Sequence, residues 1–178
     1  MPSALTAVLV SSLAIWALAK WFPDPIVGAS LPPLALAVGA AVAATGLAGA
    51  DEALDRTAAI DWPTRRLVHV LIIAVVVVGM FAAIQLIAGQ QLIPLATALR
   101  DGAGLTGLAA LGVTVLGAPL AWLFPVVSTA AAMMAPPSVQ VITWELQAPD
   151  TTAAAVTAII LAVGGTVLHA LLGPRRTV

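Results

Sequence analysis

The chain has 178 residues, of which 61% are hydrophobic and 8% are charged, and its formal net charge is −1 at pH 7. Soluble globular domains carry about 25% charged residues, so this composition excludes a water-soluble body and indicates an integral membrane protein. The near-zero net charge gives no basis for binding nucleic acid, and the absence of cysteine excludes disulfides, thiolate catalysis and cysteine-based metal sites.

The apolar runs are long, continuous and rich in alanine and leucine, which favours membrane-spanning helices over strands of alternating hydrophobicity. A helix needs about 20 apolar residues to cross the hydrocarbon core. Four such helices are predicted at 4–22, 34–50, 67–88 and 153–172. Ala17-Leu18-Ala19 has the form of a signal-peptide cleavage site, but no basic residue precedes the apolar core, so we interpret 4–22 as a retained span.

The segment 104–134 is too long for one untilted span and short for two. Cytoplasmic loops of membrane proteins carry an excess of arginine and lysine. Arginines lie between the second and third predicted spans and after the last one, whereas 136–152 has none. The arginine-bearing loop and the C-terminus should then lie inside, and 136–152 should lie outside. Two spans, 104–117 and 119–134, broken near Gly117 and Pro119, agree with all three positions. The sequence therefore predicts an all-α bundle of about six transmembrane helices, in a single domain over 1–178, with both termini cytoplasmic.

Two apolar segments are not predicted to span the membrane. "QQLIPLATALRDG" contains Pro94, Arg100 and Asp101, which indicates a segment at the outer interface or, as the alternative, a mere connector. "APPSVQVITWELQAPD" has Trp144 beside Glu145, which favours an external amphipathic helix or loop at headgroup level. No ionisable residue is then left inside a span away from its ends. That pattern speaks against a proton-driven transporter and against a membrane enzyme.

The two histidines suggest a different kind of site. His69 opens the third predicted span and His169 nearly closes the last one, so the predicted topology puts both at the cytoplasmic side. Histidines on facing helices can ligate a haem. The alternative is that each is an interfacial histidine that bonds a carbonyl group.

Small residues at near-helical spacing, including Gly104, Gly107 and the pair Gly164-Gly165, predict close helix packing or a subunit interface.

Much of the charge of the chain is concentrated between the second and third predicted spans, in "DEALDRTAAIDWPTRR". A short amphipathic helix is predicted over 51–60, with Pro63 ending it. Arginines alone would set the topology, so the additional acidic residues indicate a docking surface for a partner, although an ordinary solvated loop remains the alternative. The predicted docking residues are Asp51, Glu52, Asp55, Arg56, Trp62, Arg65 and Arg66.

This layout resembles the membrane-spanning subunit of an ABC transporter of the exporter-type permease group. The stretches "GLTGLAALGVTVLGAPLAWLFP", "WELQ" and "GPRR" are also similar to actinobacterial permease-like proteins. The resemblance implies six spans, a coupling helix between the second and third spans that docks on an ATP-binding subunit, and a short external element before the sixth span. Residues 51–66 and 136–150 stand at those two positions.

Such a subunit would sit in the bacterial plasma membrane beside a separate ATPase and a second membrane subunit, the same or related. The sequence has no Gly-rich phosphate loop, so we expect this chain to bind no ATP and to be no enzyme, with no cofactor and no metal of its own. The alternative function is a non-catalytic accessory or assembly subunit of a larger membrane complex, including an electron-transfer complex.

Overall fold

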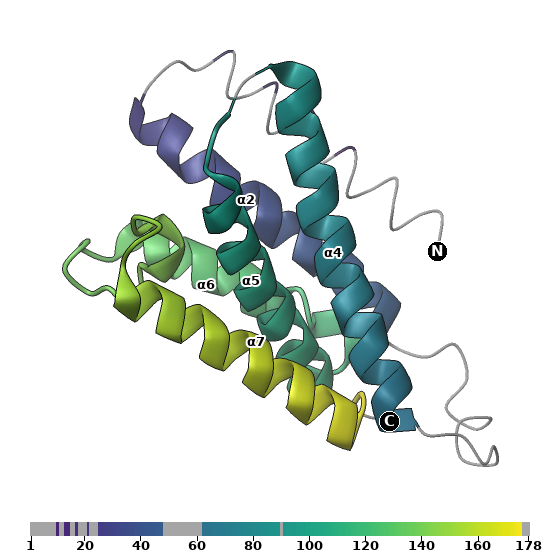
Figure 1. The fold of residues 1–178 in the computed structure, drawn as a ribbon. Coiled ribbons are helices and arrows are strands. Elements are labelled where there is room, and N and C mark those ends of the chain that lie inside the picture. The colour runs from purple at the N-terminus through teal and green to yellow at the C-terminus, as the bar shows by residue number, and fades with distance from the viewer. Residues whose placement is uncertain are drawn as a thin grey trace.

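The computed structural model describes residues 25–47, 62–89 and 91–175, together with residues 10, 13, 14, 17 and 21. No strand occurs in this part of the chain, so the prediction of an all-α protein is confirmed there. The elements, shown in Figure 1, are α2 (Pro25–Ala44), η1 (Thr45–Leu47), α4 (Trp62–Ala88), α5 (Leu95–Leu116), η2 (Ala118–Leu120), α6 (Leu123–Met134), η3 (Trp144–Leu146) and α7 (Thr152–Leu172).

Four of the described segments are long and apolar enough to cross a membrane: Ser30–Leu47, Trp62–Ile87, Leu95–Leu116 and Thr152–Leu172. They support a membrane-embedded protein. α6 has 12 residues, which at about 1.5 Å per residue is well short of a hydrocarbon core about 30 Å thick. The predicted span 4–22 lies outside the described residues except at isolated positions, so the count of six spans stays a prediction.

α2 and α4 both begin earlier than the sequence predicts. α2 starts at Pro25 and continues through Pro32 and Pro33, both buried, because neighbouring groups can compensate for the backbone hydrogen bonds that proline removes from a membrane helix. α4 starts at Trp62, and Pro63 occupies its first turn, where the missing N–H would have no helical partner in any case. Pro63 therefore opens a helix here and does not belong to a loop.

α5 corrects the prediction for "QQLIPLATALRDG". Beyond Pro94 this segment is not a separate piece outside the spans, because Leu95 and the residues after it form the first turns of a 22-residue helix of membrane-spanning length. Pro94 stands at the N-cap, a position that tolerates a residue without an N–H. The helix ends at Leu116, and Gly117 adopts φ 84, which glycine reaches without the steric cost of a side chain. The break falls at the Gly117–Pro119 position that the sequence indicates.

α5 lies at the centre of the bundle and packs against α2, α4, α6 and α7 (Figure 1). Its closest neighbour is α7, and glycines make this approach possible. A Cβ atom built on Gly165 would overlap the carbonyl group of Gly107, and one built on Gly104 would overlap the ring of Trp144. The glycines therefore pack the bundle internally, as small residues do between membrane helices.

One end of the bundle, which we call the arginine end, carries Arg65, Arg66 and Arg175. The backbone N–H of Arg175 donates to Val113 O at 3.0 Å, and its Nη1 donates to Val115 O at 2.8 Å, which ties the end of α7 to the end of α5. The guanidinium of Arg66, near the start of α4, lies against Gly173. The opposite end holds η3 and the first turns of α5 and α7.

Candidate functional site

A group of buried and half-buried polar side chains joins α5, α6 and η3 at the end of the bundle opposite the arginine end. We call it the carboxylate cluster, and it consists of Arg100, Asp101, Ser128, Thr129 and Glu145. Asp101 is 0% exposed and Glu145 is 3% exposed. Intramembrane ionisable groups are costly to bury and mark functional sites by default. This cluster is therefore the strongest candidate site in the described part of the chain.

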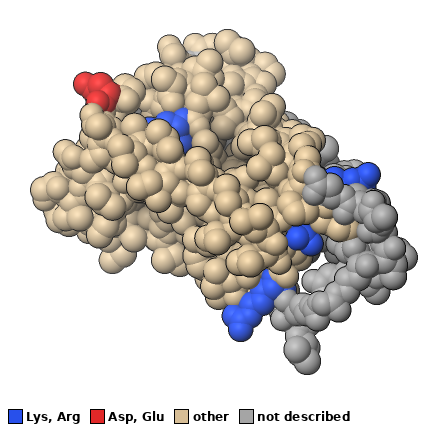
Figure 2. Space-filling model, turned by 60° about the horizontal axis from the view of Figure 1, so that its bottom comes forward, with Lys and Arg blue, Asp and Glu red and all other residues tan. Residues whose placement is uncertain are grey.

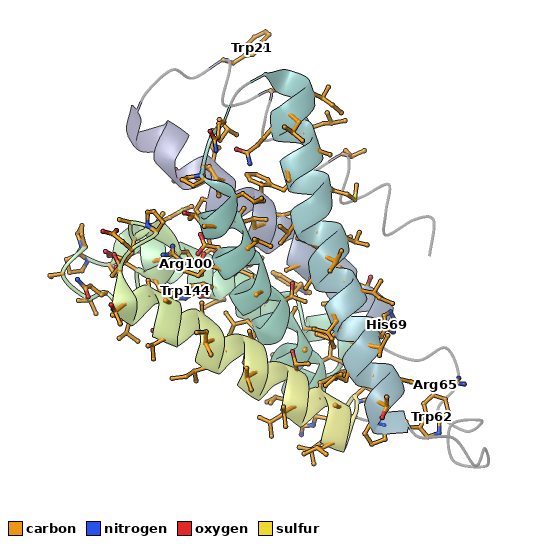
Figure 3. All side chains as sticks on the ribbon, in the orientation of Figure 1. Trp21, Trp62, Arg65, His69, Arg100 and Trp144 are labelled. Carbon is orange, nitrogen blue, oxygen red and sulfur yellow. The ribbon has the colours of Figure 1, made fainter. Side chains whose placement is uncertain are left out.

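Arg100 is the cation of the cluster, and each nitrogen of its guanidinium donates a hydrogen bond. Nε donates to Asp101 Oδ1 at 2.8 Å. The two terminal nitrogens donate to backbone carbonyls of the η3 segment, namely Ala148 O at 2.9 Å, Gln147 O at 3.0 Å and Trp144 O at 3.1 Å. Figure 3 shows Arg100 beside Trp144. The planar fork of arginine thus fixes the loop before α7 onto the first turns of α5.

Glu145 faces α6 from η3. Its Oε1 accepts a hydrogen bond from Ser128 Oγ at 2.7 Å, and its Oε2 accepts one from Thr129 Oγ1 at 2.5 Å. Burial raises the pKa of Glu145 to about 7, although the hydrogen bonds from Thr129 and Ser128 act in the opposite direction. The negative charge of Asp101 raises the pKa further. This carboxyl group can therefore change its protonation near neutral pH.

Asp101 is less fully bonded than Glu145. Its Oδ1 accepts from Arg100, but its Oδ2 is buried and has no hydrogen-bond partner among the described residues. One helical turn earlier on α5, the hydroxyl of Thr97 is likewise buried and unpartnered. Buried polar groups in native proteins are rarely left without a partner. The polar atoms at this site that lack a hydrogen-bond partner therefore lie on one face of α5, at Thr97 and Asp101.

The charged members of the cluster were expected at the surface of the protein, so the sequence did not predict this site. Trp144 and Glu145 are instead buried within the bundle. Arg100 and Asp101 are the sixth and seventh residues of a membrane-length helix, whereas the sequence predicts them outside the spans. The expectation that no ionisable residue lies inside a span away from its ends therefore no longer speaks against proton-linked transport. The available signal was the adjacent Arg-Asp pair directly before the closely spaced glycines of α5.

The predicted docking residues are only partly described. Asp51, Glu52, Asp55 and Arg56 lie outside the described residues. Trp62, Arg65 and Arg66 occupy the first turns of α4, where Arg65 is exposed and Trp62 and Arg66 are half-buried. In Figure 2 blue arginine side chains lie at this end, and a red acidic patch lies at the opposite end, where a further blue patch lies near it.

The two histidines lie toward the same end of the bundle, close enough for His69 to act electrostatically on His169. His169 is 0% exposed, and its Nδ1 lies 3.2 Å from Thr114 Oγ1 of α5. His69 projects from the flank of α4 that faces away from α7 (Figure 3). An apolar groove of about 270 Å³ between α4 and α7 is lined by Leu71 and Ala74 but by neither histidine. A haem held by the two histidines stays a prediction.

The described residues contain no group of three or more His, Cys, Asp and Glu side chains that could hold a metal ion. No protein-family model, curated protein or solved structure matches this chain. The case for a function therefore rests on the geometry of the chain itself.

Proposed function

We propose that this chain is a membrane-spanning subunit of a multi-subunit transporter in the bacterial plasma membrane, of the ABC permease type. A separate ATPase docks on the cytoplasmic segment 51–66, and a second membrane subunit, the same or related, completes the translocation path. Both termini lie in the cytoplasm. The proposal combines the layout of the sequence with the arrangement of the helix ends.

The observation that carries the proposal is the meeting of helix ends at the arginine end. Leu47, where η1 ends, and Trp62, where α4 begins, are the attachment points of the segment 48–61, and η1 contacts both α4 and η2. Arg66 and Gly173 are in contact at the same end. The acidic residues of 51–61 thus lie in the sequence between attachment points at the end that bears arginines, and charges of both signs suit docking to a soluble partner. The arginines also favour a cytoplasmic position for this end.

An accessory or assembly subunit of a larger membrane complex is the second candidate. It is favoured by the outer faces of α4 and α7. Only 28% of the apolar segment of α4 and 22% of that of α7 are buried within the protein. Lipid covers such faces equally well, so this observation does not require a protein partner. The accessory function needs packing faces and a docking segment but no ATPase.

The two candidates differ in what the chain binds. The tagged chain would be purified from its native membrane in a gentle detergent, and its partners identified by mass spectrometry. We expect a co-eluting ATPase that is lost when Asp51, Glu52 and Asp55 are all changed to Lys. The matched control is Asp150→Lys, which reverses an exposed carboxylate in the loop before α7 and should leave the ATPase bound.

Each result has a clear meaning, provided that the variants insert into the membrane as the natural chain does. An ATPase that still co-elutes with the triple variant would contradict docking at 51–66. Membrane subunits that co-elute without any ATPase would contradict the ABC permease proposal and establish the accessory function instead.

A further inference from the structure

The carboxylate cluster carries an imbalance of charge. It contains two carboxyl groups, Asp101 and Glu145, and one guanidinium, Arg100. If both carboxyl groups were ionised, the cluster would hold a formal charge of −1 in the interior of the bundle. An uncompensated buried charge is strongly unfavourable in a low-dielectric environment. The folded chain therefore gains stability from any cation that neutralises the cluster.

No other side chain on the elements packed around Glu145 supplies that positive charge. α2 and α6 contain no ionisable residue, and α7 contains only His169, near its far end. α5 contributes Arg100 and Asp101, which are already counted. Asp150, in the same loop as Glu145, is exposed and has the wrong sign. The missing positive charge must come from outside the described chain.

The guanidinium of Arg100 pairs with Oδ1 of Asp101 at 2.8 Å, whereas Glu145 is hydrogen-bonded only by hydroxyl groups. Glu145 is therefore the carboxyl group that has no cation. A metal cation fits poorly here. The described residues offer no group of three or more His, Cys, Asp and Glu ligands, and the neighbouring guanidinium would repel a metal cation. A proton needs no coordination shell and can reside on one carboxylate oxygen. A single proton supplies the one positive charge that the cluster lacks.

We propose that the carboxylate cluster is a binding site for one proton, held by Glu145 and stabilised by the charge of Asp101. The proton binds to Glu145 and converts the carboxylate to a neutral carboxyl group. That group can donate to the hydroxyl of Thr129, which then accepts in place of donating. The loop before α7, which carries Glu145, is exposed over 136–142.

This proposal does not depend on an ATPase docking at the arginine end. It gives the chain a proton-responsive element of its own, at the end of the bundle opposite to 51–66. A transporter subunit could use it to link the loop before α7 to the external pH. The same site would function in an accessory subunit.

Infrared spectroscopy tests the site directly, because a protonated carboxyl group in an apolar environment has its own carbonyl stretching band. The full chain in lipid nanodiscs would be titrated in sodium-free buffer. We expect a band that disappears as the pH rises through about 7, the pKa to which burial raises Glu145. The band should be absent in Glu145→Gln and unchanged in Asp150→Asn, which removes an exposed carboxylate from the same loop.

Asp101→Asn provides a second variant with a different expected result. Removing the negative charge of Asp101 should shift the titration of the Glu145 band to lower pH without abolishing it. A natural chain without any protonated carboxyl band at about pH 5 would overturn the proposal. So would a band that persists in Glu145→Gln, or one that sodium ions displace at constant pH, since the latter would make the cluster a metal-cation site.

Discussion

Gly165 of α7 crosses Gly107 of α5 so closely that a methyl group on Gly165 would overlap the carbonyl group of Gly107. The preceding residue, Gly164, has open space around the position of a Cβ atom. The two adjacent glycines therefore have opposite roles. One permits the contact between the two most extensively packed helices, and the other faces away from it.

Gly165→Ala should therefore destabilise the bundle, because the helices must separate to admit the methyl group. Overpacking of this kind costs about 1–3 kcal/mol. Gly164→Ala is the matched control and should be neutral or slightly stabilising, since alanine favours a helix. Thermal unfolding in detergent, followed by circular dichroism, measures both. Equal stability of the two variants would mean that α5 and α7 do not cross at Gly107.

Arg100 should be the most sensitive charged residue in the described chain. Arg100→Gln leaves Asp101 without its cation and the carbonyls of the η3 segment without their donors. Breaking a buried ion pair by removing one partner costs about 3–5 kcal/mol. Arg65→Gln, which removes an exposed guanidinium at the other end, should change stability little. The comparison uses the same thermal unfolding, and comparable losses in both variants would contradict the burial of Arg100.

Arg100→Lys separates charge from geometry. Lysine keeps the positive charge beside Asp101 but cannot reach three carbonyl groups and a carboxylate at once. We expect most of the loss seen with Arg100→Gln, together with increased proteolysis of the loop 135–151. A lysine variant as stable as the natural chain would show that only the charge matters at this position.

The stability of the chain should depend on pH through Glu145. Its ordinary pKa is 4.5 and its pKa in the folded chain is about 7, so between these values the folded state binds the proton more tightly than the unfolded state. The stabilisation is complete below pH 4.5 and is lost as the pH rises through about 7. The shift corresponds to a difference on the order of 3 kcal/mol in the free energy of unfolding.

Melting temperatures measured between about pH 5 and about pH 8 test this dependence. The natural chain should be less stable at the higher pH, and Glu145→Gln should reduce the difference because its amide cannot ionise. Asp150→Asn should keep the full dependence. If the natural chain became more stable as the pH rises across this interval, the unfolded state would bind more protons than the folded state. That result would exclude a proton held by Glu145 in the folded chain.

Local patterns were enough to predict the helical class and the approximate position of α7 and of most of α4, because both are long uninterrupted apolar segments. The break at Gly117 was also predictable, since glycine and proline mark helix ends. The start of α5 could not be predicted in the same way, because Arg100 and Asp101 lower the local hydropathy and suggest a surface position. Their burial depends on carbonyl groups of 144–148, more than 40 positions away in the chain. No local pattern reports such a contact.

The proposed membrane orientation can be tested by labelling, because the natural chain has no cysteine and every introduced thiol is therefore unique. Arg65→Cys and Asp150→Cys place thiols at exposed positions at opposite ends of the bundle. If the arginine end is cytoplasmic, a membrane-impermeant maleimide should label Asp150→Cys in intact cells and label Arg65→Cys only after permeabilisation. The reverse pattern would invert the topology. Labelling of both thiols in intact cells would show that the two ends are not separated by the bilayer, which would contradict a spanning bundle.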